Sequence, residues 1–164
     1  MSSLKELWET WGKSCQRMDD FGPNVLGSNE TATRYALINP ILRVLGWDVE
    51  NPGLVRLDWK QAHGLIPDYT CLKNGRPVLY VEAKKWGTNS AISKLKNPLS
   101  DYKIQKLKKY CKYNSVEIGA FTDGGSWYII DFTNFKQPEI TFIDAANAGK
   151  KEVKKLLKIS YEEL

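Results

Sequence analysis

The sequence predicts an α/β or α+β fold in which a mixed central sheet is flanked by helices. Three observations carry this prediction. Apolar residues recur at helical spacing between residues 4 and 18, in the segment that ends at Gly46, and again between residues 98 and 114. Short strand-like runs, separated by turn residues, fill the middle. The segments therefore follow the order helix, helix, several strands, helix, strands, helix, which is typical of one sheet covered by helices.

Two helices are predicted before the first strand. Leu4 to Met18 has apolar residues at helical spacing, and residues 19–28 contain two glycines and a proline that predict a loop. A serine or an asparagine can then cap a second helix that runs to Gly46. Its apolar positions nearly encircle it, so we expect a buried central helix with a kink at Pro40.

The remaining segments alternate strands with two further helices. The expected strands are residues 47–50, residues 54–59, the two arms of a hairpin within Gly64 to Lys84, and residues 116–122, 126–133 and 139–143. Residues 85–97 are polar, and we expect them to be mobile. Pro98 to Asn114 predicts a helix that turns Leu99, Tyr102, Ile104, Leu107 and Cys111 inward. Lys150 to Ile159 predicts a basic closing helix.

Composition limits the classes of function. A chain of 164 residues suits a single domain, and a net charge of +5 is compatible with a polyanionic partner. Three cysteines without a CxxC pair favour a reducing compartment, and a single histidine excludes HExxH zinc proteases. The N-terminus is charged where a signal peptide is apolar, and no apolar stretch is long enough to span a membrane. We therefore expect a cytoplasmic protein.

The hairpin would bring Asp68 and Glu82 together if its two strands pair in the register that sets these two acids opposite each other. A two-residue turn at Asn74-Gly75 would set Asp68 opposite Val81, so that Glu82 would point away from it. A three-residue loop or a β-bulge would instead place Asp68 opposite Glu82. Residues opposite each other on paired strands have Cβ atoms roughly 4.5–5.5 Å apart, and two carboxylates that close need a proton or a cation between them. Because a shared cation would give the two acids a chemical role, we predict the second register.

An acidic pair beside a lysine suits phosphodiester hydrolysis. Mg²⁺ uses one or two carboxylates and completes its shell with water and substrate phosphate. Lys84 shares a strand face with Glu82 and would orient or deprotonate the metal's water and neutralise charge on the phosphate. The alternative is that an acid and a lysine two residues apart form a solvated strand edge, which is the commoner case for such a pattern alone.

Pro67-Asp68 followed by Glu82-Ala83-Lys84 resembles the PD-(D/E)xK nuclease signature. The wider context resembles the N-terminal nuclease domain of type I restriction enzyme R subunits. The matching pieces run in family order from about residue 28 to residue 133: Glu30–Arg34, Ile41–Leu42, Leu45–Val49, Pro67–Tyr69, Val81–Lys84, Gly119–Gly124 and Trp127. The short nuclease motif is degenerate, and the ordered set is much more specific.

The resemblance implies a restriction-endonuclease-like α/β fold and Mg²⁺-dependent cleavage of DNA, with Mn²⁺ as a substitute. It gives Asp68 and Glu82 as metal ligands, the Ala83 carbonyl as a third, and Lys84 as the catalytic lysine. Glu30 matches an acid that approaches the metal from the first core helix. The core would be residues 28–133 of one domain, with a helical extension over residues 1–20 and the basic helix 150–159 after it.

One family motif departs from its pattern. The family often has a Gln and a Tyr four residues apart on the helix after the catalytic strand, and here Gln105 and Tyr110 are five apart. If Tyr110 sets the register, Lys106 replaces the Gln; if Gln105 sets it, Lys109 replaces the Tyr. A contact with DNA from this helix stays an expectation.

Further contacts with nucleic acid are expected from basic side chains. Lys85 and Arg34 are candidates beside the predicted site, and Trp86 is expected to pack beneath its loop. Two helices are crowded with lysines, namely Lys103, Lys106, Lys108, Lys109 and Lys112, and Lys150, Lys151, Lys154, Lys155 and Lys158. Solvated helix faces are the default interpretation of these lysines, and sequence-independent phosphate contacts are the alternative.

The sequence therefore predicts a metal-dependent endonuclease of a restriction system that acts on DNA. The chain contains no GxxxxGK[ST] P-loop, so motor and methyltransferase functions would come from other subunits or domains. A homodimer is a further hypothesis, because cutting both strands usually needs two sites. The rival functions are a non-catalytic nucleic-acid-binding module on the same fold and a structural protein with fortuitous motifs.

Overall fold

The computed structural model describes residues 3–87 and 95–164. Its centre is one mixed sheet in the order β1-β2-β3-β4-β5-β6, in which β3 and β4 are parallel and all other neighbours are antiparallel. The strands are β1 (Val55–Leu57), β2 (Tyr69–Lys73), β3 (Arg76–Ala83), β4 (Ile118–Thr122), β5 (Ser126–Asp131) and β6 (Glu139–Asp144). The predicted fold, a mixed sheet flanked by helices, is confirmed, and its class is α/β.

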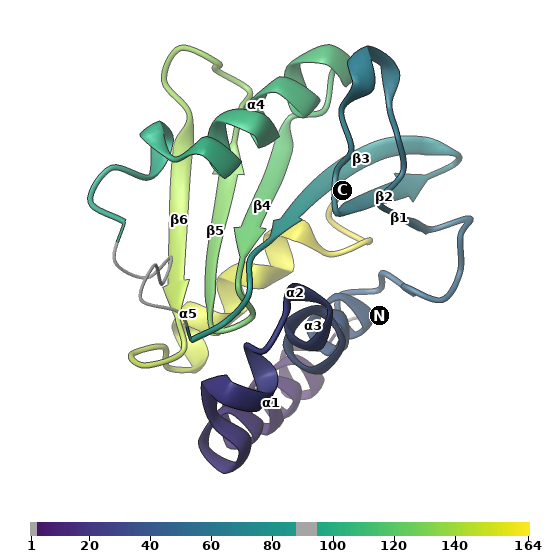
Figure 1. The fold of residues 1–164 in the computed structure, drawn as a ribbon. Coiled ribbons are helices and arrows are strands. Elements are labelled where there is room, and N and C mark those ends of the chain that lie inside the picture. The colour runs from purple at the N-terminus through teal and green to yellow at the C-terminus, as the bar shows by residue number, and fades with distance from the viewer. Residues whose placement is uncertain (1–2, 88–94) are drawn as a thin grey trace.

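Helices cover both faces of the sheet (Figure 1). They are α1 (Leu4–Leu26), α2 (Glu30–Thr33), α3 (Asn39–Val44), α4 (Tyr102–Asn114) and α5 (Lys150–Val153), with a 3₁₀ segment at Lys154–Ile159 after α5. One apolar core joins α1, α3, α5 and residues such as Val81 and Ala83 to one face. A second core packs α4 on the other face, around Tyr80 and Phe121. The two cores fix which strand residues meet which helices.

The first helix is longer than the sequence predicts. Leu4–Leu26 includes most of the stretch that we expected to be a loop, so that expectation was wrong. The helical conformation is interrupted inside this range, because Gly22 has φ 67° and ψ 179°. Pro23 then starts a last short helical piece. Glycine and proline therefore mark a kink here, and the helix continues beyond it.

The second predicted helix has an irregular middle. Asn29 caps α2 by accepting a hydrogen bond from the backbone N–H of Ala32. A π-helical segment, Arg34–Ile38, then joins α2 to α3 just before Pro40. The irregularity expected at this proline is thus a widened turn, because a proline has no N–H to donate to the preceding turn.

Two local expectations were wrong. Residues 47–50 form an irregular segment that ends in a turn instead of a strand, although Trp47 is fully buried and donates a 2.7 Å hydrogen bond from Nε1 to the Ile159 carbonyl. Tyr102, expected to face inward, is 77% exposed because it lies at the first position of α4. Part of the polar segment 85–97 lies outside the described residues, so its expected mobility stays a prediction.

The β2–β3 hairpin has the register that was predicted from its two acidic residues. Asn74 and Gly75 form a two-residue turn with φ 53° and 73°, and Lys73 pairs with Arg76 across it. The pairing then shifts by one, because Leu72 faces Pro77 whereas Cys71 faces Leu79. Val78 is therefore an extra residue in β3, and the predicted β-bulge is confirmed.

Candidate active site

The bulge brings Asp68 and Glu82 together at one end of the hairpin. Tyr69 pairs with Val81, and continuing this register by one residue sets Asp68 opposite Glu82. Oδ2 of Asp68 accepts a 2.7 Å hydrogen bond from the backbone N–H of Ala83. Asp68 is 8% exposed and Glu82 is fully buried. We call these two residues the acidic pair.

Glu82 carries an unusual charge environment. Burial and then the neighbouring carboxylate of Asp68 raise its pKa to about 7, against the opposing effect of Lys106 and Lys103. Oε1 of Glu82 is buried without a hydrogen-bond partner among the described residues. A buried carboxylate oxygen without a partner is costly, so this atom is suited to a ligand.

Helix α4 supplies the positive charge that faces the acidic pair. Nζ of Lys103 lies 3.5 Å from Oε2 of Glu82 and 4.0 Å from Oδ2 of Asp68. Nζ of Lys106 lies 3.6 Å from the same Glu82 oxygen. We call Lys103 and Lys106 the α4 lysines; their side chains are 27% and 24% exposed. Burial works against the charge on Lys103, but Glu82, Asp68 and Glu30 outweigh it and raise the pKa of Lys103.

Tyr110 sets the register of α4 against the site. Its hydroxyl donates a 3.0 Å hydrogen bond to the Ile66 carbonyl, and the Lys106 ammonium lies 5.4 Å from the centre of its ring. Gln105 points elsewhere and donates to the Leu99 carbonyl. Of the two registers left open by the sequence, the structure has the one in which Lys106 takes the place of the Gln.

The α2 region also lies near the acidic pair. Burial and then the charge of Asp68 raise the pKa of Glu30, which places this carboxylate within electrostatic reach of the acidic pair. Arg34 does not pair with Glu30; it forms a 3.2 Å ion pair with Asp58 and donates a 2.9 Å hydrogen bond to the Asp68 carbonyl. Its guanidinium also lies over the Tyr69 ring. Arg34 therefore positions the segment that carries Asp68, and its contact with DNA stays a prediction.

Lys84 extends the end of β3 by one residue. Its backbone N–H donates a 2.9 Å hydrogen bond to the Thr122 carbonyl, so Lys84 continues the pairing of β3 with β4. Because side chains alternate along a strand, Lys84 lies on the same face as Glu82, and Ala83 lies on the other. Within residues 3–87 and 95–164, the half-buried Lys84 side chain has no ion pair. Lys85 is exposed. Trp86 packs against a small apolar cluster around Met18, as expected.

The donor set is compatible with a divalent ion of the Mg²⁺ type. No group of three or more His, Cys, Asp or Glu side chains in the described part of the chain is arranged to hold a metal ion. Mg²⁺ does not need one, because it combines one or two carboxylates with water and substrate oxygens. The acidic pair supplies two carboxylates, one with an unpartnered oxygen, and the Ala83 carbonyl follows directly in the chain.

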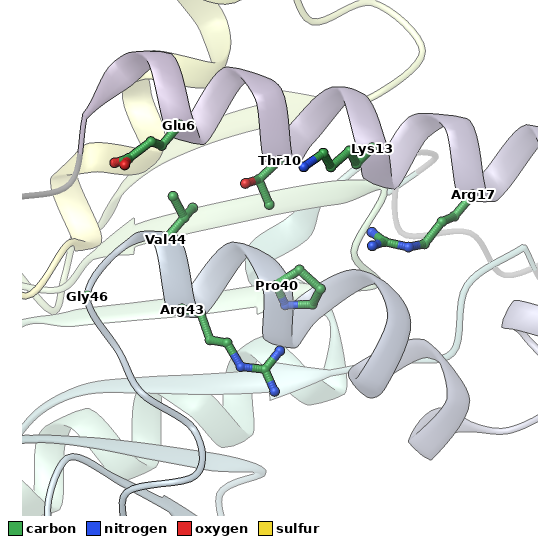
Figure 2. Close-up of a pocket in the computed structure, with 8 residues that line it drawn as sticks. All are labelled: Glu6, Thr10, Lys13, Arg17, Pro40, Arg43, Val44 and Gly46. Atoms are coloured by element: carbon green, nitrogen blue, oxygen red, sulfur yellow. The ribbon is translucent and has the colours of Figure 1, made fainter.

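A large surface hollow lies elsewhere, between α1 and α3 (Figure 2). It is lined by Glu6, Thr10, Lys13, Arg17, Pro40, Arg43, Val44 and Gly46. Arg43 is already paired with Glu50 at 2.7 Å. None of the residues expected in the active site lines this hollow, and the buried carboxylates with the lysines that contact them lie elsewhere, at the acidic pair.

The sequence around this site matches a known protein family. Residues 55–138, just over half of the chain, match the family model described as the type I restriction enzyme R protein N terminus. The chain belongs to this family. The matched span contains the acidic pair, Lys84 and the part of α4 that carries Lys106 and Tyr110.

The fold of this family member also occurs in a solved structure. A chain in the structure titled "cryoEM structure DrdV-DNA complex" matches it with a TM-score of 0.53 and 17% identity. The match covers 96% of this chain and 14% of that one, so the chain spans a small part of its structural neighbour.

No curated protein matches the chain. Among the described helices, none is long and apolar enough to cross a membrane.

Sequence reasoning missed the direct part that Lys103 plays in the site of this family member. The sequence places Lys103 on the basic face of its helix, whereas in the structure its ammonium contacts both members of the acidic pair. Its position is three residues before Lys106 and seven before Tyr110, which is the spacing of one helix face. Once Tyr110 sets the register, this spacing points to Lys103 as well.

Proposed function

We propose that this member of the R-protein N-terminal family is a Mg²⁺-dependent endonuclease that hydrolyses DNA phosphodiester bonds in a restriction system. The single observation that carries the proposal is the buried acidic pair, which the Val78 bulge sets face to face beside Lys84. A binding-only protein has no need to bury two carboxylates with an unpartnered oxygen, because that arrangement costs stability.

Each side chain then has a role in the proposed reaction. Asp68 and Glu82 would hold the metal ion, with the Ala83 carbonyl as a third donor and Glu30 within electrostatic reach. Lys84 orients the attacking water and offsets the negative charge that develops on the phosphate. When bound, Mg²⁺ supplies Lewis-acid polarisation of a phosphoryl oxygen and acidifies water. The α4 lysines add positive charge where the DNA backbone would approach.

The same features support the substrate and the partners that we propose. A net charge of +5 and a basic α4 favour a polyanion, and the related structure is titled as a complex with DNA. No element in the described part of the chain presents an obvious base-reading helix, so we propose that sequence specificity comes from other subunits or domains. A second copy of the chain would supply the second cut in a duplex.

The test is a cleavage assay on supercoiled plasmid DNA with Mg²⁺, with Mn²⁺ and with EDTA. Wild type is compared with Asp68→Ala, with Lys84→Ala and with Lys151→Ala, which removes one exposed lysine from α5 as the control. We expect metal-dependent cleavage by wild type and Lys151→Ala, and a loss of at least about 100-fold in the other two variants.

Two outcomes would count against the proposal. Cleavage that survives both Asp68→Ala and Lys84→Ala would overturn the assignment of the site. DNA binding by wild type without cleavage under any metal condition would favour the non-catalytic binding module on the same fold.

A further inference from the structure

We propose that the ammonium group of Lys103 is an internal counter-ion of the metal-free protein, and that a divalent metal ion must displace it from the acidic pair. This inference rests on the proposed function, because it concerns how the same site is loaded. It adds a regulatory step in which the site is held closed to metal by the protein's own positive charge.

The first argument is geometric. Among the residues that the structure describes, Lys103 is the one cation that forms ion pairs with both members of the acidic pair, at 3.5 Å to Glu82 and 4.0 Å to Asp68. Lys106 contacts Glu82 alone. The Lys103 ammonium therefore occupies the position between the two carboxylates, which is where a shared cation would be bound.

The second argument is electrostatic. Mg²⁺ prefers carboxylate oxygens, so an ion held by the acidic pair would share the two carboxylates that Lys103 contacts. Two cations on one pair of carboxylates repel each other strongly in a poorly hydrated site. Since Glu82 is fully buried, solvent screens this repulsion little. Metal ion and ammonium therefore compete, and each is stable in the site when the other is absent.

The third argument concerns the route by which Lys103 leaves. It lies in the first turn of α4, where its backbone N–H is held by the Asp101 side chain, and the Lys103 side chain is 27% exposed. Its flexible four-carbon stem lets the ammonium turn to solvent while the helix stays in place. A DNA phosphate near α4 would give the released ammonium a new partner, so DNA would favour metal loading.

Metal binding without DNA tests the displacement separately from cleavage. Mn²⁺ affinity is measured by calorimetry for wild type, Lys103→Met, Lys106→Met and Lys109→Met. Lys109 is exposed on the same helix, so its substitution matches the change in net charge. We expect Lys103→Met to bind Mn²⁺ about tenfold more tightly than wild type, Lys106→Met by a smaller factor, and Lys109→Met within twofold.

A stability measurement in EDTA provides a second readout that does not involve metal. Lys103→Met leaves two facing carboxylates without their shared cation, so we expect its Tm at pH 8 to fall several degrees below that of Lys109→Met. Circular dichroism at 20 °C checks that the variants are folded. An unchanged Tm would show that Lys103 is not the counter-ion and would overturn the inference.

The binding outcomes separate this inference from the proposed function. Mn²⁺ binding by wild type that Asp68→Ala abolishes, with equal or weaker affinity in Lys103→Met, would overturn the displacement and leave the metal site standing. Absence of Mn²⁺ binding in every variant, Lys103→Met included, would overturn both.

Discussion

The backbone N–H of Ala83 donates a 2.7 Å hydrogen bond to the Asp68 carboxylate, so the strand that carries Glu82 also orients its acidic partner. This contact separates two properties of Asp68. Its oxygen acts as a hydrogen-bond acceptor for the fold, and its charge is available to a cation. The two properties can be removed one at a time.

We expect Asp68→Asn to keep the fold and to lose metal binding, because an amide oxygen can accept the Ala83 N–H without carrying charge. Asp68→Ala loses both, and leaving the buried N–H without a partner costs about 1–3 kcal/mol of the free energy of unfolding. Urea unfolding and Mn²⁺ titration measure the two effects. Equal stability of the Asn and Ala variants would contradict this role of the hydrogen bond.

The stability of the metal-free protein should fall as the pH rises through the titration of Glu82. Burial and the charge of Asp68 raise the pKa of Glu82 from 4.5 to about 7 in the folded state. The folded state therefore binds a proton more tightly than the unfolded state, so this contribution is present below about pH 4.5 and is lost as the pH rises towards 7. Glu82→Gln mimics the protonated acid and should raise stability in EDTA at pH 8 by about 2 kcal/mol.

The control for this pH effect is Glu139→Gln, at an exposed position of β6. Thermal unfolding at pH 5 and pH 8 measures both variants. The gain from Glu82→Gln should shrink at pH 5, where wild-type Glu82 is already protonated, and Glu139→Gln should match wild type at both values. A gain that is the same at pH 5 and pH 8 would argue against the raised pKa.

Arg34→Met tests whether this arginine positions the site or contacts DNA directly. The variant loses the 2.9 Å hydrogen bond to the Asp68 carbonyl and the ion pair with Asp58. We expect a loss of about 1–3 kcal/mol in the free energy of unfolding, together with weaker Mn²⁺ binding. Arg76→Met, at an exposed position beside the hairpin turn, should change neither. Weaker DNA binding with unchanged stability would indicate a direct contact instead.

The turn that follows β4 provides a test of the packing beneath the site. Gly124 has φ +83°, and a Cβ there would lie 2.4 Å from the Cβ of Leu37. Gly124→Ala should therefore destabilise the protein by about 1–3 kcal/mol. Gly12 lies in α1, where an added Cβ would meet nothing within 4 Å, so Gly12→Ala should stabilise by about 0.5–1 kcal/mol. Chemical denaturation distinguishes the opposite signs.

Much of the fold could be predicted because its signals are local. The hairpin turn, the Asp123-Gly124-Gly125 turn and the helical spacing of Ile104 and Leu107 each identify their element without knowledge of the rest. The register of the hairpin was predicted for a different reason. Two opposed acids imply a shared cation, and this chemical requirement excluded the regular pairing from the turn.

The failures have a tertiary origin. Trp47 and Val49 alternate with polar residues as a strand would, but they are buried in the core that includes α5 and its 3₁₀ extension, which are about a hundred residues away in sequence. Gly22 and Pro23 indicated a loop because a local pattern cannot distinguish a kink within a helix from its end. Lys103 was missed because its meaning depends on Glu82, on another element.

The extra residue Val78 shows that the candidate site depends on how many residues separate its members along the hairpin, as well as on which residues they are. One added residue inverts the sidedness of every position between it and the end of the strand, so the same acidic and basic side chains without it would be divided between the two layers of the molecule. A motif search that scores letters and gaps is blind to this inversion. Whether the number of residues between the two acids is odd or even, considered together with the type of turn, would distinguish hairpins that bring the acids onto one face from hairpins that only contain the motif.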